Sequence, residues 1–273
     1  MTGLLRRIYI HALPAPLKRL ARTSYLLGNA TLFRWRHPGS DCTCNFCGFR
    51  AGRFAPGGYA EGVLVEKQVI GGGYRPHARC PKCYSLDRER QILVVLEDHL
   101  PIDDSWRVLH VAPERNLNEV IRARFTNHVD ECDLEPEAYA WAKNISKQDL
   151  TQLDLPDDSF DLVLCNHVLE HIPADRQAMA ELYRVVKPGG YAILQIPYSE
   201  SIPTTEEDLS LSTDEERLRT YGQVGHVRLY ERDDYISRVT SQGWQSRFLG
   251  PTAFPASLKL GLDRREGIFL FQK

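Results

Sequence analysis

The sequence predicts an α/β fold built around a mostly parallel sheet. Three short, largely apolar runs are typical of buried strands: residues 108–111, 129–132 and 160–165. Between the first two, residues 116–125 carry apolar side chains at helical spacing. A strand, a helix and a strand joined by short connections form a βαβ unit, and such units build parallel sheets.

Polar residues follow each of these strands. Glu114 follows the first strand, Asp133 the second, and Asn166 and His167 the third. In an open parallel sheet, ligands bind just beyond the carboxyl ends of the strands. We therefore expect a cofactor site at that end of the sheet.

Residues on either side of this unit predict further elements. Residues 85–100 carry apolar side chains on one helical face, and Pro101 ends that helix. A helix after Asp175 should stop at Gly189 and Gly190. The later elements expected are a strand at 191–196, a helix at 232–242 and an edge hairpin of strands at 244–249 and 267–271.

Two sequence blocks resemble a known family. Residues 157–172 contain Asp-Asp-Ser-Phe-Asp-Leu-Val and then His-Val-Leu-Glu-His-Ile, and residues 181–190 continue with Glu-Leu-Tyr-Arg-Val-Val-Lys-Pro-Gly-Gly. Residues 105–273 thereby resemble class I S-adenosylmethionine-dependent methyltransferases, of the methyltransferase type 11-like kind. The resemblance implies a Rossmann-like, seven-stranded, mostly parallel sheet with an antiparallel last strand, and S-adenosylmethionine as cofactor.

The turn after the first strand departs from the family pattern. Glycines usually let the backbone approach the cofactor there, but this chain has Ala112, Pro113 and Glu114. Pro113 also lacks an N–H donor. The turn resembles a glycine-poor His-x-Ala-Pro-Glu variant, and we expect Glu114 to supply a polar contact in place of the glycine backbone.

The resemblance also implies the cofactor-binding residues. Asp133, 21 residues past Ala112, is expected to hold the ribose hydroxyls, and Asp149 the adenine amine. The implied cofactor-binding set is His110, Ala112, Glu114, Asp133, Leu134, Asp149, Leu150 and Asn166.

An insertion at residues 199–230 suits a lid over the acceptor. It begins acidic and ends in a glycine-punctuated segment with His226 and Arg228. In an extended segment these two side chains point the same way, so a proton acceptor and an anchor for an anion would share one surface. The alternative is that Arg228 pairs with the acidic run and His226 is solvated. The predicted catalytic residues are His167, His226 and Arg228.

Two Cys-x-x-Cys pairs precede this region. Cys44, Cys47, Cys80 and Cys83 form a set of four thiolates suited to a structural zinc ion, with an iron–sulfur cluster as the minor alternative. Residues 62–70 alternate in the manner of a strand, and the glycines at 71–73 supply a turn. We therefore expect a small zinc ribbon.

The chain divides into three regions. Residues 1–40 carry seven basic and no acidic residues, and are expected to form two short helices broken by Pro14 and Pro16. This segment suits a nucleic-acid, membrane-surface or partner contact, or packing on its own protein. Residues 41–100 hold the zinc ribbon and a connecting helix, and residues 101–273 form the methyltransferase domain.

The predicted function is methyl transfer from S-adenosylmethionine to an oxygen or nitrogen of a small molecule. An acidic lid disfavours a phosphate backbone, but RNA methylation with the ribbon and basic arm as the grip is the alternative. A zinc-stabilised scaffold with a lapsed site is a second alternative. The sequence has no apolar run long enough for a membrane span, and its cysteine usage favours the reducing cytoplasm.

Overall fold

The structure, a computed structural model, describes residues 28–60, 62–142 and 144–273. The two helices expected around Pro14 and Pro16 lie outside these residues. Residues 28–36 form a helix, after which the chain enters the cysteine-rich module.

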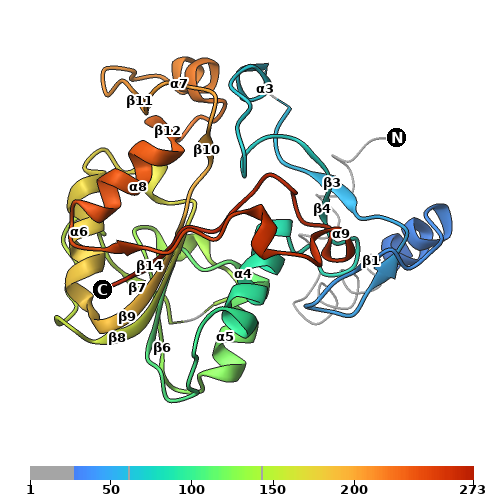
Figure 1. Ribbon diagram of the computed structural model, residues 1–273, viewed down its shortest axis with the longest axis horizontal. Helices are drawn as coiled ribbons and strands as arrows, with labels where there is room; N and C mark the ends of the chain where they lie inside the picture. Colours follow the sequence, from blue (N-terminus) through green and yellow to red (C-terminus); the bar gives the residue numbers. More distant parts are fainter. Residues whose placement is uncertain (1–27, 61, 143) are drawn as a thin grey trace.

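A seven-stranded sheet forms the centre of the molecule, in the order β13-β14-β9-β8-β5-β6-β7 (Figure 1). Its strands are β5 (Val108–Val111), β6 (Val129–Asp133), β7 (Ser146–Lys147), β8 (Phe160–Asn166), β9 (Val186–Gln195), β13 (Gln245–Ser246) and β14 (Leu270–Gln272). The neighbours from β7 to β9 are parallel, whereas β14 is antiparallel to both β9 and β13. The predicted Rossmann-like sheet with an antiparallel last strand is confirmed.

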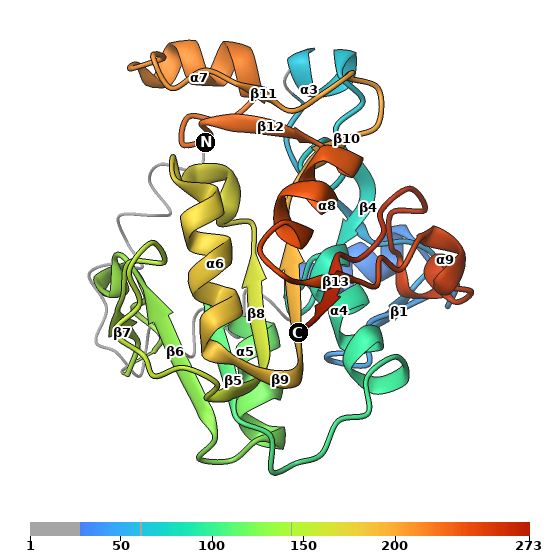
Figure 2. The same cartoon turned by 60° about the vertical axis from the view of Figure 1, so that its left-hand side comes forward.

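Helices cover both faces of this sheet (Figure 2). They are α4 (Asp87–Asp98), α5 (Arg115–Arg124), α6 (Asp175–Val185) and α8 (Arg232–Thr240). Helices α4 and α5 bury their apolar residues in one core cluster, and α6 and α8 bury theirs in another. Strand β8 separates the two clusters, because Leu162 and Leu164 point into the first while Val163 and Cys165 point into the second.

Helix α6 ends earlier than the sequence suggested. It stops at Val185, and β9 begins at the next residue, so Gly189 and Gly190 lie within a strand and do not end the helix. Phe160 pairs with Val186, and the register then shifts before the regular pairing with β8 resumes. The irregularity lets β9 take up the glycine pair without losing its place in the sheet.

The cysteine-rich module consists of two short hairpins and one helix. It contains β1 (Cys42–Thr43), β2 (Arg50–Ala51), β3 (Ala55–Gly57), α3 (Gly62–Glu66) and β4 (Arg75–Arg79). The strand expected at residues 62–70 is wrong, because residues 62–66 are helical. Leu64 of this helix is buried against Ile202 and Tyr221 of the insertion, and such tertiary contacts outweigh the β propensity of the valines.

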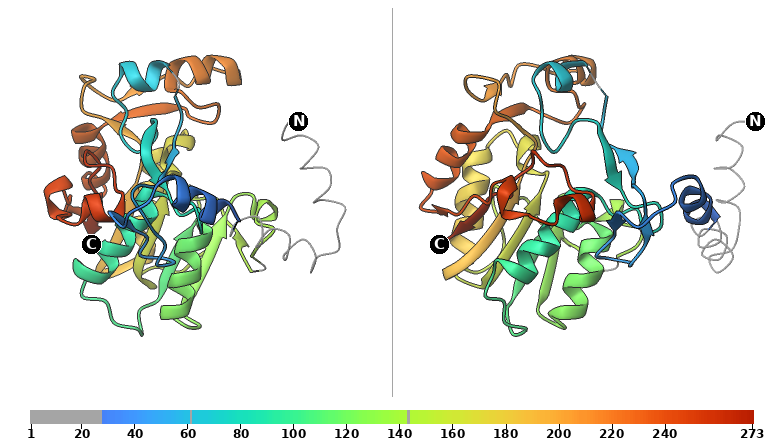
Figure 3. Two further views of the ribbon diagram at one scale, coloured as in Figure 1. Left: turned by 90° about the vertical axis from the view of Figure 1, so that its right-hand side faces the viewer. Right: turned by 45° about the vertical axis from the view of Figure 1, so that its right-hand side comes forward.

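The insertion forms a layer above the carboxyl ends of the main strands. It contains β10 (Tyr198–Ser199), β11 (Glu206–Glu207), α7 (Asp214–Tyr221) and β12 (Arg228–Glu231), with the three strands in the order β10-β12-β11. Helices α7 and α3 lie side by side at the top of the molecule (Figure 3). The module and the insertion therefore meet over the same end of the sheet.

Four short elements complete the described part of the chain: η1 (Pro136–Ala138), η2 (Leu169–His171), η3 (Pro251–Ala253) and α9 (Ser257–Leu260). In the part of the chain that the structure describes, no helix has the length and apolar character needed to span a membrane.

Candidate active site

A cavity of about 790 Å³ opens at the carboxyl ends of β5, β6 and β8. This is the end of a parallel sheet where ligands bind. Five residues of the expected cofactor-binding set line it: Ala112, Asp133, Leu134, Asp149 and Leu150. We call this space the cofactor cavity.

Two carboxylates in this cavity are held in place by their neighbours. The Tyr139 hydroxyl donates to Asp133 Oδ2 at 2.6 Å, and the Glu135 amide donates to Oδ1 at 2.7 Å. The hydroxyl and amide of Thr151 donate to Asp149, which lowers the pKa of that carboxyl. Each carboxylate oxygen has a second lone pair, so both groups can still accept from ligand hydroxyls or an amine.

The glycine-poor turn keeps a backbone shape that glycine usually adopts. Ala112 has φ +46°, in the left-handed region. Its amide donates to the Cys132 carbonyl at 2.9 Å, which ties the turn to the neighbouring strand. The turn therefore approaches the cavity in a glycine-like conformation, at the cost of some backbone strain.

Three expected cofactor contacts do not line the cavity. His110 Nε2 lies 3.3 Å from Glu114 Oε2, and the Asn166 amide donates to the same oxygen at 3.3 Å. Burial favours the neutral form of Glu114, but the His110 contact and nearby Arg88 hold its pKa below the ordinary value. His110 on β5 and Asn166 on β8 are buried, and both contact Glu114 in the turn before α5, so this polar network lies outside the lining of the cavity.

A second cavity, of about 570 Å³, adjoins the first. Its wall comes mainly from four regions: the module, the start of helix α4, the segment that follows β8, and the insertion. The lining includes Tyr59, Tyr74, Arg79, Arg88, His167, Glu170, His171 and His226. Since His167 and His171 line both cavities, we call the second one the acceptor cavity.

The histidines at this junction are uncharged at neutral pH. Burial, with Arg88 and Arg75 nearby, holds the pKa of His167 well below its ordinary value. Burial and neighbouring His171 lower the pKa of His226 to about 3. His226 is therefore a weak proton acceptor, which does not favour the general-base role expected for it.

Arg228 does not reach either cavity. Its guanidinium is fully buried and donates to Glu207 at 2.7 Å and to the carbonyls of Leu169, Ile172 and Pro173. The expected shared surface with His226 is absent, because β12 begins only at Arg228 and His226 lies in the preceding loop. Arg228 pairs with Glu207 in the acidic part of the insertion, as the alternative stated, but the other half of that alternative is wrong, because His226 is buried and not solvated.

Sequence reasoning missed other residues around the acceptor cavity. Arg79 and Arg88 present guanidinium groups there, and Tyr59 and Tyr74 form an exposed aromatic rim. Glu170 also lines the cavity, and burial raises its pKa to about 8. The sequence signal for Glu170 was its position between His167 and His171. The arginines and tyrosines had no such signal, because they come from the module and its connecting helix.

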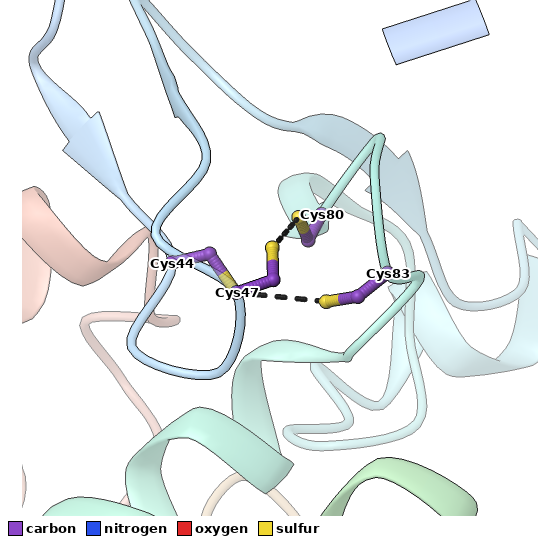
Figure 4. A group of neighbouring side chains, drawn as sticks. All are labelled: Cys44, Cys47, Cys80 and Cys83. Atoms are coloured by element: carbon purple, nitrogen blue, oxygen red, sulfur yellow. Dashed lines mark hydrogen bonds between the residues drawn. The ribbon is translucent and has the colours of Figure 1, made fainter. Parts of the chain in front are cut away.

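The four cysteine sulfurs of the module converge on one point (Figure 4). Cys44 Sγ lies 3.7 Å from Cys83 Sγ, and Cys47 Sγ lies 3.7 Å from Cys80 Sγ. All four lie within 4.8 Å of one another. A tetrahedral zinc ion with 2.3 Å Zn–S bonds separates its sulfurs by about 3.8 Å, so the donor set and its spacing fit zinc.

Residues 113–194 match the family described as a methyltransferase domain. A phosphatidylethanolamine N-methyltransferase of Cereibacter sphaeroides is 31% identical over 26% of this chain and 33% of its own length. An uncharacterized methyltransferase of Mycobacterium ulcerans is 50% identical over 15% of this chain and 16% of its own. The chain thus spans at most a third of either relative.

Solved structures give partial matches to this chain. An S-adenosylmethionine-dependent methyltransferase of Mesorhizobium loti is 15% identical, with a TM-score of 0.47, over 66% of this chain and 96% of that one. The domain match, together with the strand order observed here, supports a class I S-adenosylmethionine-dependent methyltransferase.

Proposed function

We propose that this protein transfers the methyl group of S-adenosylmethionine to an oxygen or nitrogen of a small molecule. The observation that carries the proposal is the junction of two cavities at His167 and His171, at the carboxyl ends of the parallel strands. One cavity suits the cofactor and the other an acceptor. A methyl transfer needs the nucleophile in line with the methyl–sulfur bond, and two adjoining cavities allow that alignment.

The cofactor cavity fits S-adenosylmethionine through its own residues. Asp133 lines the cavity, and its carboxylate is held by Glu135 and Tyr139. In that position it could accept hydrogen bonds from the ribose hydroxyls. Asp149 and Leu150 lie together on its wall, where one would accept from the adenine amine and the other would cover the ring. When bound, the cofactor supplies an electrophilic methyl group.

The acceptor cavity favours a small molecule with an anionic or strongly polar group. Its volume is within the range of small-molecule sites. Arg79 and Arg88 are the cations that we assign to the acceptor. Arg88 Nε lies 3.9 Å from Glu114 Oε1, a looser pair than the buried one between Arg75, the third arginine on this wall, and Asp87. The arginines replace Arg228 as the proposed anchors for the acceptor.

The experiment is a calorimetric titration of the full chain with S-adenosylhomocysteine. We expect micromolar binding of one molecule per chain. If the folded protein does not bind S-adenosylhomocysteine, the methyltransferase proposal is overturned and the scaffold alternative is favoured.

RNA methylation is the second candidate, and one surface feature favours it. Trp35 is 78% exposed on the helix formed by residues 28–36, between the exposed Arg34 and Arg36. An aromatic side chain flanked by arginines suits stacking on a base beside a phosphate. Fluorescence anisotropy with labelled RNA tests this candidate. Changing Arg34, Trp35 and Arg36 together to alanine should abolish RNA binding.

We also infer that Cys44, Cys47, Cys80 and Cys83 hold a structural zinc ion. The sulfur spacing supports zinc, although the same ligands suit an iron–sulfur cluster. Elemental analysis and the visible absorption spectrum of unchelated protein distinguish the two, because only the cluster is coloured.

A further inference from the structure

Glu170, His171 and His226 form a polar cluster where the two cavities meet. Glu170 and His171 belong to η2, directly after β8, and His226 belongs to the insertion. One ligand atom from each of the three lies within 4.8 Å of the others. All three side chains line the acceptor cavity.

The Glu170 carboxylate has no adequate protein partner. The residue is 1% exposed, and neither oxygen has a hydrogen-bond partner among the described residues. Its closest basic atoms are His167 Nδ1 at 3.4 Å and His226 Nε2 at 3.9 Å from Oε1. A buried carboxylate without hydrogen bonds is costly, and a cation bound to its oxygens would offset that cost.

His171 is oriented in the way of a metal ligand. Its Nδ1 lies 2.9 Å from the Gly225 carbonyl oxygen, so Nδ1 carries the proton and Nε2 is left with a lone pair. Metal-binding histidines commonly donate their other N–H to a carbonyl. A Cβ at Gly225 would lie 2.8 Å from His171 Nδ1, so a glycine is needed for this approach.

His226 completes the set from the opposite side. Its ring meets that of His171 edge-on, with 4.8 Å between ring centroids. Its Nδ1 is buried and has no hydrogen-bond partner in the described part of the chain. The backbone holds the loop in place, since the Val227 amide donates to the Glu170 carbonyl at 3.0 Å.

We infer that Glu170, His171 and His226 bind a divalent transition-metal ion at the floor of the acceptor cavity. Two imidazoles and one carboxylate suit zinc, iron(II), cobalt or manganese, and three protein ligands leave coordination positions for another molecule. Since all three residues line the acceptor cavity, a molecule in that cavity could fill those positions. This site is separate from the four cysteines, which lie in the module and use sulfur only.

The role of this metal rests on the proposed function and narrows the acceptor class. An acceptor with a hydroxyl oxygen can complete the coordination, and a bound cation lowers the pKa of such a group. The hydroxyl releases its proton to solvent, and its oxygen then forms the bond to the methyl carbon. The methyl–sulfur bond breaks with its electron pair staying on sulfur, which leaves S-adenosylhomocysteine. The acceptor is therefore expected to be an oxygen nucleophile.

The test counts metal in the untagged full-length protein. Protein is equilibrated with zinc chloride, desalted and analysed for zinc, and the same is done for Glu170→Gln and His226→Ala. We expect each variant to hold one zinc fewer per chain than the unchanged protein. His128→Ala, which changes an exposed histidine elsewhere, should hold the full number.

Equal zinc content in all four proteins would overturn the inference. Cobalt titration gives an independent readout, because cobalt on thiolates absorbs strongly in the near ultraviolet whereas cobalt on nitrogen and oxygen ligands absorbs weakly. Only the weak bands should disappear in the variants, and this readout applies to whichever of the two variants folds. S-adenosylhomocysteine binding is measured on the same samples. If the unchanged protein holds one zinc more than the variants but does not bind S-adenosylhomocysteine, the metal site stands and the methyltransferase proposal is overturned.

Discussion

The two cavities are built in different ways. The cofactor cavity takes its walls mainly from consecutive βα connections of one sheet, to which the insertion adds Gly225. The acceptor cavity takes its walls from the cysteine module, the start of helix α4, the segment after β8 and the insertion, which are far apart in the sequence. The first cavity depends mainly on one local architecture, whereas the second exists only when the module and the insertion are packed on the sheet.

The largest effect should come from breaking the module. Cys80→Ser removes a zinc ligand, and structural zinc contributes folding free energy directly. We expect the variant to lose both its zinc and most of its soluble yield, measured by elemental analysis and gel filtration. Cys42→Ser is the control, because Cys42 is buried nearby but lies outside the four-sulfur cluster. Full zinc content in Cys80→Ser would rule out the four-cysteine site.

Arg228 tests whether the insertion is scaffold or active-site machinery. Arg228→Ala removes the buried donor shared by Glu207 and the carbonyls of Leu169, Ile172 and Pro173, and loss of one partner of a buried pair costs about 3–5 kcal/mol of unfolding free energy. Denaturant unfolding measures this loss. Arg219→Ala, at an exposed pair in the same insertion, should cost less than about 1 kcal/mol. A stable Arg228→Ala protein would show that the guanidinium is not structural.

Glu89 of helix α4 connects stability to pH. It is buried, and burial with Glu114 nearby raises its pKa to about 7 from 4.5. The folded state therefore binds this proton more tightly than the unfolded state, so stability falls as pH rises from about 4.5 to about 7. The loss is up to about 3 kcal/mol.

Unfolding measured at several pH values checks this sign. Glu89→Gln should remove the loss over that range, while Glu119→Gln at an exposed position of α5 should leave it unchanged. If the unfolding free energy of Glu89→Gln falls with pH as it does in the unchanged protein, another group causes the effect.

The smallest expected effect concerns the cofactor cavity alone. Asp133→Ala should weaken S-adenosylhomocysteine binding by about 1.5–3 kcal/mol, the usual range for hydrogen bonds to a charged group. Asp130→Ala is the matched control on the same strand, since Asp130 pairs with Arg107 outside the cavity. Calorimetry that finds equal affinity in the two folded variants would remove Asp133 from the site.

The sequence was informative where local pattern decides structure. Apolar periodicity predicted β5, α5, β6 and β8, and a cavity lies at the ends of these strands, where the polar residues are. The same reasoning put His110, Glu114 and Asn166 in contact with the cofactor, because the position of a residue in a turn does not reveal whether its side chain faces the ligand or the layer below.

The acceptor side was not accessible to that reasoning. Residues 62–66 have a strand-like alternation but fold as a helix against the insertion. Arg228 and His226 are two residues apart and yet face different surroundings, because a loop ends between them. Arg79 and Arg88 reach the cavity only through the packing of the module on the sheet, which no local pattern encodes.

One buried arginine links that packing to the behaviour of the whole molecule. Arg90 donates to the carbonyls of Ser85 and Ala78 on the module side, and of Leu260 and Gly261 near the carboxyl end. A chain cut at residue 100 would leave the last two carbonyls without their donor and would expose the apolar residues that α4 covers. The module and the sheet therefore should melt together in one cooperative transition, and limited proteolysis should not release either as a stable fragment.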